Sequence, residues 1–103
     1  MLDNLSEEEL LIIHRGFYVF GDSTSLKILY ELNKFGDKNF SDLRDHLNIN
    51  PASLSKKLKV LIEVGLVVAD RTHDNLRVFY SIGKHRRALR KFLESFEKIS
   101  KQL

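Results

Sequence analysis

The sequence predicts a small α+β fold that is mostly helical and contains one β-hairpin. Within residues 40–66, apolar residues recur at helical spacing on both sides of a short polar turn, and Gly65 closes the second run. Two β-prone runs follow, Leu66–Arg71 and Arg77–Ile82, with the polar residues 72–75 between them. A helix, a turn, a second helix and a hairpin, in this order, make up a winged helix-turn-helix.

The composition fits a single globular domain. The chain has 103 residues, of which 43% are hydrophobic and 30% are charged. We expect an N-terminal helix in residues 1–21, the winged-helix core in residues 22–82 and a C-terminal helix in residues 83–103. No apolar run approaches the roughly 20 residues that a membrane-spanning helix needs, and the acidic start lacks the basic residues of a signal peptide. A cytoplasmic location is therefore expected.

The first helix is expected from about Glu7 to Phe20. Ser6 and Glu9 form a capping-box pattern at its start, in which each side chain accepts a hydrogen bond from the backbone amide of the other residue. Gly21 then ends the helix, because glycine readily adopts the conformation that follows a helical segment.

The second helix is expected to run to Phe35. Asp22 or Ser23 can cap its start, and Gly36 closes it. This helix should brace the helix pair that follows it in the chain. Its buried side is expected to consist of Leu26, Leu29, Tyr30 and Leu32.

The helix pair is expected to begin at Ser41, whose hydroxyl can cap free backbone amides while Asp42 occupies the positive first turn. A short polar turn separates the two helices. Asn50 then provides a capping side chain before Pro51, whose fixed φ suits the first helical position. The second helix of the pair should reach Val64. Its expected apolar stripe is Leu54, Leu58, Leu61 and Ile62.

The exposed face of this second helix has a composition that suits a DNA major groove. Small residues near its start permit close approach to base edges, and its lysines can meet phosphates on either side. The hairpin tip is basic and polar, so that it can contact the flanking backbone or a minor groove. The candidate DNA-binding residues are Ser41, Asn50, Ala52, Ser53, Ser55, Lys56, Lys57, Lys59, Arg71, His73, Asn75 and Arg77.

Both features also have a plain structural interpretation. The lysines could form an ordinary solvated face, and the charges of the tip could simply blunt an edge strand. The distribution of charge favours the DNA interpretation. Residues 1–50 contain five Lys or Arg against nine Asp or Glu, whereas residues 51–103 contain twelve against five. Positive charge is thus concentrated in the segments that would face a polyanion.

These features together resemble the winged-helix transcriptional regulators of prokaryotes, among which ArsR-like, HxlR-like and MarR-like proteins are the nearest groups. The resemblance covers about residues 24–82. HxlR-like proteins usually carry a cysteine near the N-terminus, and metal-sensing ArsR-like proteins carry cysteine or paired acidic and histidine ligands; neither pattern is present here. The most diagnostic part is the spacing of Leu54, Leu58, Leu61, Gly65, Leu66 and Val67.

The C-terminal segment, from about Lys84 to Leu103, places apolar residues at alternating spacings of three and four, which predicts a coiled-coil-like seam. A monomer of this size would have difficulty covering both this seam and the aromatic N-terminal helix. We therefore expect a homodimer through the two terminal helices, as in related winged-helix regulators. The expected interface residues are Leu10, Ile13, Phe17, Phe20, Leu89, Phe92, Phe96, Ile99 and Leu103.

Two points about the terminal helices stay open at this stage. They could instead pack only on the core of their own chain. The basic run in residues 84–91 could contact DNA backbone, or it could only keep the last helix soluble. A dimer would set two recognition helices about one DNA turn apart, roughly 34 Å, and would imply a pseudo-palindromic binding site.

The sequence offers little for catalysis or metal binding. Cysteine is absent, which excludes disulfides, thiolate zinc sites and thiol nucleophiles. The four histidines are spread over different expected elements without metal-ligand spacing, and no phosphate-binding glycine loop or nucleophile elbow is present. We therefore expect no enzyme activity, no metal and no cofactor.

The leading hypothesis is a sequence-specific regulator of transcription that binds double-stranded DNA as a homodimeric repressor. The helix from Pro51 to Val64 would lie in the major groove, and the hairpin from Leu66 to Ile82 would lie on the flanking backbone or minor groove. Two alternatives stay open: a winged-helix module that binds other proteins within a larger complex, and a non-specific, chromatin-type DNA-binding protein. The residues indicate no particular small-molecule effector.

Overall fold

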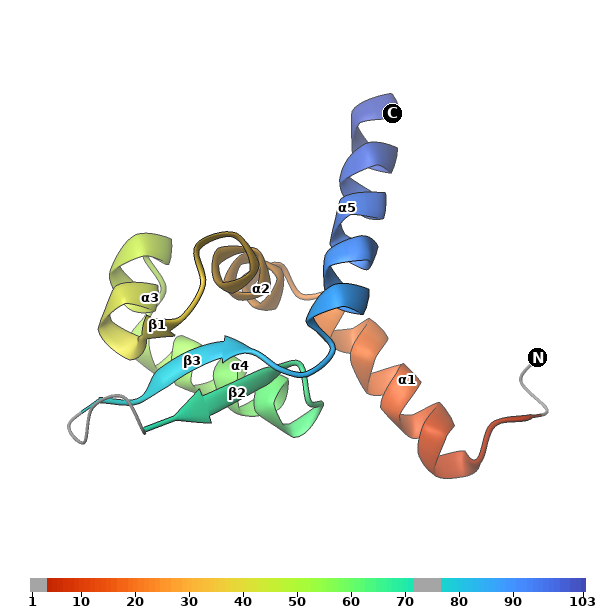
Figure 1. The fold of residues 1–103 in the computed structure, drawn as a ribbon, viewed down its shortest axis with the longest axis horizontal. Coiled ribbons are helices and arrows are strands. Elements are labelled where there is room, and N and C mark those ends of the chain that lie inside the picture. The colour runs from red at the N-terminus through yellow and green to blue at the C-terminus, as the bar shows by residue number, and fades with distance from the viewer. Residues whose placement is uncertain (1–3, 72–76) are drawn as a thin grey trace.

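The computed structural model describes residues 4–71 and 77–103, and Figure 1 shows their arrangement. The helices are α1 (Glu7–Phe20), α2 (Ser23–Phe35), α3 (Phe40–Leu47), α4 (Pro51–Glu63) and α5 (Arg86–Gln102). The strands are β1 (Lys38–Asn39), β2 (Val67–Asp70) and β3 (Phe79–Ile82). This mostly helical chain with a small antiparallel sheet confirms the predicted fold class.

The sheet has the strand order β1-β3-β2. Strands β2 and β3 form the predicted hairpin over a shorter span than expected, with Val67 opposite Ile82 and Asp70 opposite Phe79. The structure adds β1, in which Lys38 pairs with Tyr80. The sequence did not indicate this strand, because two residues are too few to show an alternating pattern.

The core lies where α2, α3 and α4 cover the sheet, with the base of α5 against α2. The prediction for α2 is confirmed at Leu29 and Leu32, whereas Leu26 and Tyr30 are only partly buried. Ile28, which is fully buried, was not anticipated. The buried apolar residues are Val19, Ile28, Leu29, Leu32, Leu43, Leu54, Leu58, Leu61, Val67, Ile82, Leu89 and Leu93.

Several predicted helix ends are confirmed. The hydroxyl of Ser6 accepts a hydrogen bond from the amide of Glu9, and the Glu9 carboxylate accepts one from the amide of Ser6, both at 3.1 Å. Asp22 caps α2. Gly65 has a φ of 80°, in the left-handed region that favours glycine, directly after the C-cap residue of α4.

The predicted start of α3 was wrong. The side-chain oxygen of Asn39 accepts a hydrogen bond from the amide of Asp42 at 2.8 Å, so that α3 begins at Phe40 and Ser41 lies inside its first turn. Asparagine caps helices as well as serine does, and two capping residues close together cannot be ranked by pattern alone. Asp42 nevertheless lies in the first turn, as predicted.

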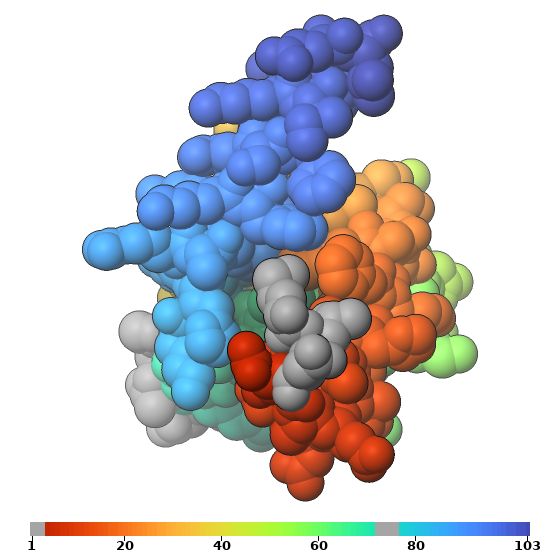
Figure 2. Space-filling model, turned by 90° about the vertical axis from the view of Figure 1, so that its right-hand side faces the viewer, coloured from red at the N-terminus to blue at the C-terminus, as the bar shows by residue number. Residues whose placement is uncertain are grey.

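The helices α1 and α5 extend from the core at the end that lies opposite the Asp70–Phe79 end of the hairpin (Figure 1). Figure 2 shows α5 projecting beyond the rest of the chain, with α1 in red to orange on the same face. In α1 only Val19 is buried, and in α5 only Leu89 and Leu93. Within the described residues, no helix has the length and apolar character needed to cross a lipid bilayer.

Candidate nucleic-acid interface

The start of α4 is organised by Asn50. Its side-chain oxygen accepts hydrogen bonds from the amides of Ala52 at 2.9 Å and Ser53 at 3.3 Å. Pro51 occupies the first helical position, where its missing N–H leaves no bond unmade. The predicted cap is confirmed, and it places two small side chains on the first turn of α4, where a close approach to another surface meets little obstruction.

The faces of α4 divide largely as the sequence predicts. Leu54, Leu58 and Leu61 are fully or almost fully buried. Ile62 was assigned to the same buried stripe, but its exposed fraction is 39%, which corrects that assignment. Ile62 lies about 100° around the helix from Leu61, at the margin of the stripe. The outward-facing residues of α4 include Ala52, Ser55, Lys56 and Lys59, which are exposed, and Ser53, which is half-buried.

Lys57 lies in a different environment from the other lysines of α4. Its ammonium donates to the carboxylate of Asp22 at 3.1 Å, and both side chains are 26% exposed. Asp22 also accepts hydrogen bonds from the amide and the hydroxyl of Ser25, at 2.9 and 2.8 Å. This ion pair ties α4 to the corner between α1 and α2. For Lys57 to reach a phosphate, as the sequence predicts, it would have to leave Asp22.

The environment of Asp22 favours its ionised form. Burial acts to raise the pKa of Asp22, but the hydrogen bonds from Ser25 and the charge of Lys57 outweigh it and hold the pKa below its usual value. The stabilisation is therefore complete above the pKa of an unfolded aspartate, about 4, and is lost as the pH falls through the lowered value in the folded protein.

We expect Asp22→Asn to lower the free energy of unfolding by about 0.5–1 kcal/mol at pH 7, because asparagine can still cap α2 but no longer neutralises Lys57. The difference from wild type should shrink below about pH 4. Urea titrations at several pH values would measure it. Asp45→Asn is the matched control, since Asp45 pairs with Arg44 on the exposed surface. Equal effects of the two substitutions at pH 7 would contradict the assigned role of Asp22.

The hairpin side of the site is described only in part. Arg71 is exposed at the end of β2, and Arg77 is exposed just before β3. The predicted contacts of His73 and Asn75 lie outside the described residues. Ser41 and Arg77, which are far apart in the sequence, line one shallow depression of about 260 Å³ between α3 and β3. The structure therefore brings together one residue from the helix pair and one from the hairpin.

Histidines do not gather into a metal site in the described residues, where no group of three potential ligands lies close enough to hold an ion. His46 contacts the Glu31 carboxylate through Nδ1 at 3.2 Å. That contact joins α3 to α2 on the surface. It is a pairwise contact between helices and adds no third ligand.

The predicted dimer seam is largely exposed. The exposed fractions are 66% for Phe17, 54% for Phe96 and 51% for Ile99. Leu89, by contrast, is already buried in the core of its own chain, so that a partner could cover it no further. Phe20 and Phe92 are partly buried against each other, with ring centroids 4.4 Å apart.

An apolar pocket of about 300 Å³ opens between α1, α2 and α5 beside this seam. Its only hydroxyl belongs to Tyr30, which donates to the backbone oxygen of Leu93 at 3.2 Å. Burial, with the charge of Glu97, raises the pKa of Tyr30 above its usual value. The lining residues are Phe17, Phe20, Gly21, Leu26, Tyr30, Phe92, Leu93 and Phe96.

Residues 22–68 match the model of the bacterial regulatory protein, arsR family. This segment contains α2, the helix pair α3 and α4, and the start of β2. Among curated proteins, none matches the chain.

Solved structures resemble the chain over most of its length. Rv0081 from M. tuberculosis has a TM-score of 0.77 and 22% identity, covering 95% of this chain and 93% of that one. The homodimeric winged helix-turn-helix DNA-binding domain of Mb0332 from Mycobacterium bovis has a TM-score of 0.75 and 22% identity, covering 92% of this chain and 89% of that one. The transcriptional repressor BigR from Xylella fastidiosa has a TM-score of 0.73 and 20% identity, covering 90% of each chain. Likeness at these identities establishes the winged helix-turn-helix fold.

Proposed function

We propose that this protein is a homodimeric transcriptional repressor that binds specific double-stranded DNA, because residues 22–68 match the family model of the bacterial regulatory protein, arsR family. The family and the fold are those of transcriptional regulators rather than of enzymes. The repressor role is supported by the similarity to BigR, which is a repressor. Dimerisation is supported by the similarity to Mb0332, whose DNA-binding domain is homodimeric.

The single observation that carries the proposal is the exposed face of α4. Ala52, Lys56 and Lys59 are exposed and Ser53 is half-buried, while the leucines of α4 hold it against the core. A helix that is fixed on one side and small and basic on the other can enter a major groove without losing its support. We assign Ala52, Ser53 and Lys56 to the base edges and Lys59 to a phosphate.

The hairpin would contact DNA beside the groove that α4 occupies. Arg71 and Arg77 flank the tip, and the depression that Arg77 shares with Ser41 could receive a backbone phosphate between α3 and the hairpin. In the proposed dimer, these contacts would occur twice, one DNA turn apart. The binding site would then consist of two inverted half-sites.

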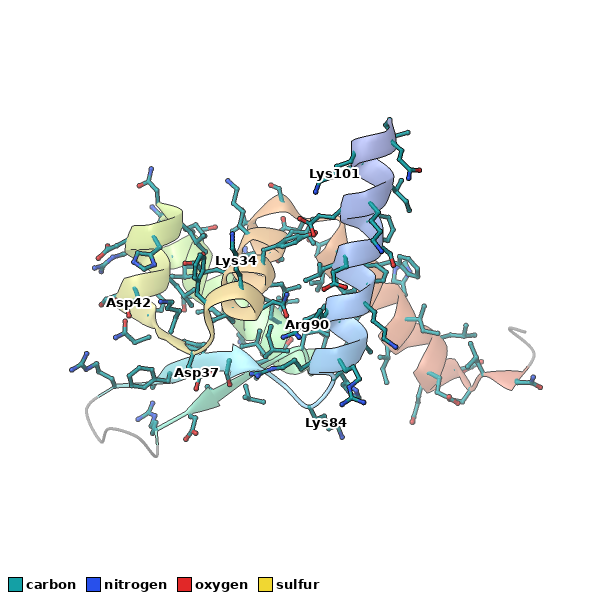
Figure 3. All side chains as sticks on the ribbon, turned by 45° about the horizontal axis from the view of Figure 1, so that its top comes forward. Lys34, Asp37, Asp42, Lys84, Arg90 and Lys101 are labelled. Atoms are coloured by element: carbon teal, nitrogen blue, oxygen red, sulfur yellow. The ribbon has the colours of Figure 1, made fainter. Side chains whose placement is uncertain are left out.

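We expect Lys56→Ala to weaken binding to the specific duplex by roughly tenfold, about 1.4 kcal/mol, without lowering the melting temperature. Fluorescence anisotropy with the DNA upstream of the protein's own gene, and with a random duplex of equal length, would measure both affinity and preference at two salt concentrations. Lys101→Ala is the matched control, because Figure 3 places Lys101 near the free end of α5. Equal affinities of the two variants would remove Lys56 from the interface.

The wild-type titration separates the proposed function from its alternatives. Tighter, salt-sensitive binding to the upstream duplex supports a specific regulator. Equal binding to both duplexes would indicate non-specific coating of DNA. Absence of binding to either duplex would contradict the proposal and favour a module that binds other proteins.

A further inference from the structure

A second basic surface lies away from α4, at the base of α5. Residues 84–91 contain five cations, all of them exposed. Figure 3 shows Lys84 and Arg90 at this base, far from Lys101. Four of the cations line a shallow depression of about 480 Å³. We call Lys84, Arg86, Arg87, Arg90 and Lys91 the α5 basic cluster.

The charges of the α5 basic cluster are not neutralised within the described residues, where none of its side chains forms an ion pair. The first turn of α5 contains no acidic residue, and His85 provides no side-chain cap. Arg86 and Arg90 lie four residues apart on the helix, as do Arg87 and Lys91. Each such pair of like charges destabilises the helix by about 0.2–0.5 kcal/mol. The positive end of the helix dipole adds to this repulsion. An anionic partner would relieve it.

The α5 basic cluster is joined firmly to the end of α4. The amide of Gly83 donates a hydrogen bond to the backbone oxygen of Leu66 at 3.0 Å. Leu66 directly follows Gly65, which closes α4. A Cβ at Gly83 would lie only 3.0 Å from the backbone oxygen of Gly65, so the two segments pass each other closely. These contacts hold the start of the α5 basic cluster beside the C-terminal end of α4.

This attachment fixes the distance between the α5 basic cluster and the proposed groove contacts. The 13 residues of α4 span about 20 Å, which is a little over half of a DNA turn. Arg71 and Arg77 lie at the other end of β2 and β3, beyond the paired residues Asp70 and Phe79. Basic groups therefore occur at both ends of the sheet, with α4 between them.

We propose that the α5 basic cluster binds backbone phosphates of the same DNA, outside the bases that α4 contacts. This inference rests on the proposed function. It extends the DNA-contacting surface of the protein from α4 towards the terminal helices. Arg87 and Arg90 belong to adjacent turns of one helix face, where their planar guanidinium groups can engage neighbouring phosphate oxygens. Phosphate contacts of this kind add affinity and salt dependence but no base preference.

The test compares two double variants of α5. Arg87→Gln/Arg90→Gln removes two cations from the α5 basic cluster, and Lys98→Gln/Lys101→Gln removes two from the far half of the same helix. If each arginine contacts one phosphate, the proposed dimer loses four phosphate contacts, and the slope of log affinity against log salt should become shallower by about 3.6 in the first variant. It should barely change in the second. Hydroxyl-radical footprinting should show a loss of backbone protection only with the first.

The first variant should also be at least as stable as wild type in thermal melts, because it removes like-charge pairs. Equal salt slopes for the two variants, with normal binding by the wild type, would overturn this inference alone. Dissociation of the proposed dimer by the first variant, with an unchanged footprint, would assign the α5 basic cluster to a second copy and would also overturn it. A wild-type protein that binds neither duplex would overturn the proposed function itself.

Discussion

Phe96→Glu should convert the proposed dimer to monomers and weaken specific DNA binding by at least about 100-fold. Phe96 is 54% exposed, its ring lies 4.9 Å from that of Phe92, and it lines the apolar pocket beside the seam. In a dimer, a glutamate there would be buried among aromatic rings without a partner, at a cost of several kcal/mol. Each monomer would then bind one half-site, without the gain from two linked contacts.

Sedimentation equilibrium would measure the oligomeric state, and anisotropy titrations would measure the affinity for the upstream duplex. Lys101→Gln is the control for charge, since it also makes the net charge more negative by one but lies opposite the seam on α5. Phe96→Leu should retain the dimer, because it keeps an apolar side chain. A Phe96→Glu protein that stays dimeric would show that the seam is not the interface.

The helix pair was predictable because its signals are local. Asn50 and Pro51 indicate the start of α4, and Gly65 indicates its end. Each signal comes from the conformational preference of a single residue. The apolar stripe follows from helical periodicity, and the structure confirms it at Leu54, Leu58 and Leu61. These preferences do not depend on distant parts of the chain.

Features that depend on distant residues were not predictable in this way. The pairing of β1 with β3 joins two segments about 40 residues apart, and its two residues carry no pattern of their own. The ion pair between Asp22 and Lys57 spans 35 positions, so the sequence could not distinguish Lys57 from the other lysines of α4. Likewise, the burial of Leu89 depends on how α5 packs against α2.

The same distinction between local pattern and tertiary packing can be measured at two adjacent residues of α4. Leu61→Ala should lower the free energy of unfolding by about 2–5 kcal/mol, because Leu61 is fully buried and the substitution leaves a cavity. The melting temperature should fall by at least about 10 °C. Ile62→Ala removes a side chain of equal size that is 39% exposed, and should cost about 1 kcal/mol or less.

Both variants should be compared with wild type at one protein concentration, since dimerisation would make the melting temperature depend on concentration. Equal losses of stability would mean that Ile62 belongs to the buried stripe after all, as periodicity alone suggested. Below its melting temperature, Leu61→Ala should still bind the upstream duplex, because its outward-facing lysines are unchanged. Loss of binding by a folded Leu61→Ala protein would show that the packing of α4, and not only its exposed face, sets the affinity for DNA.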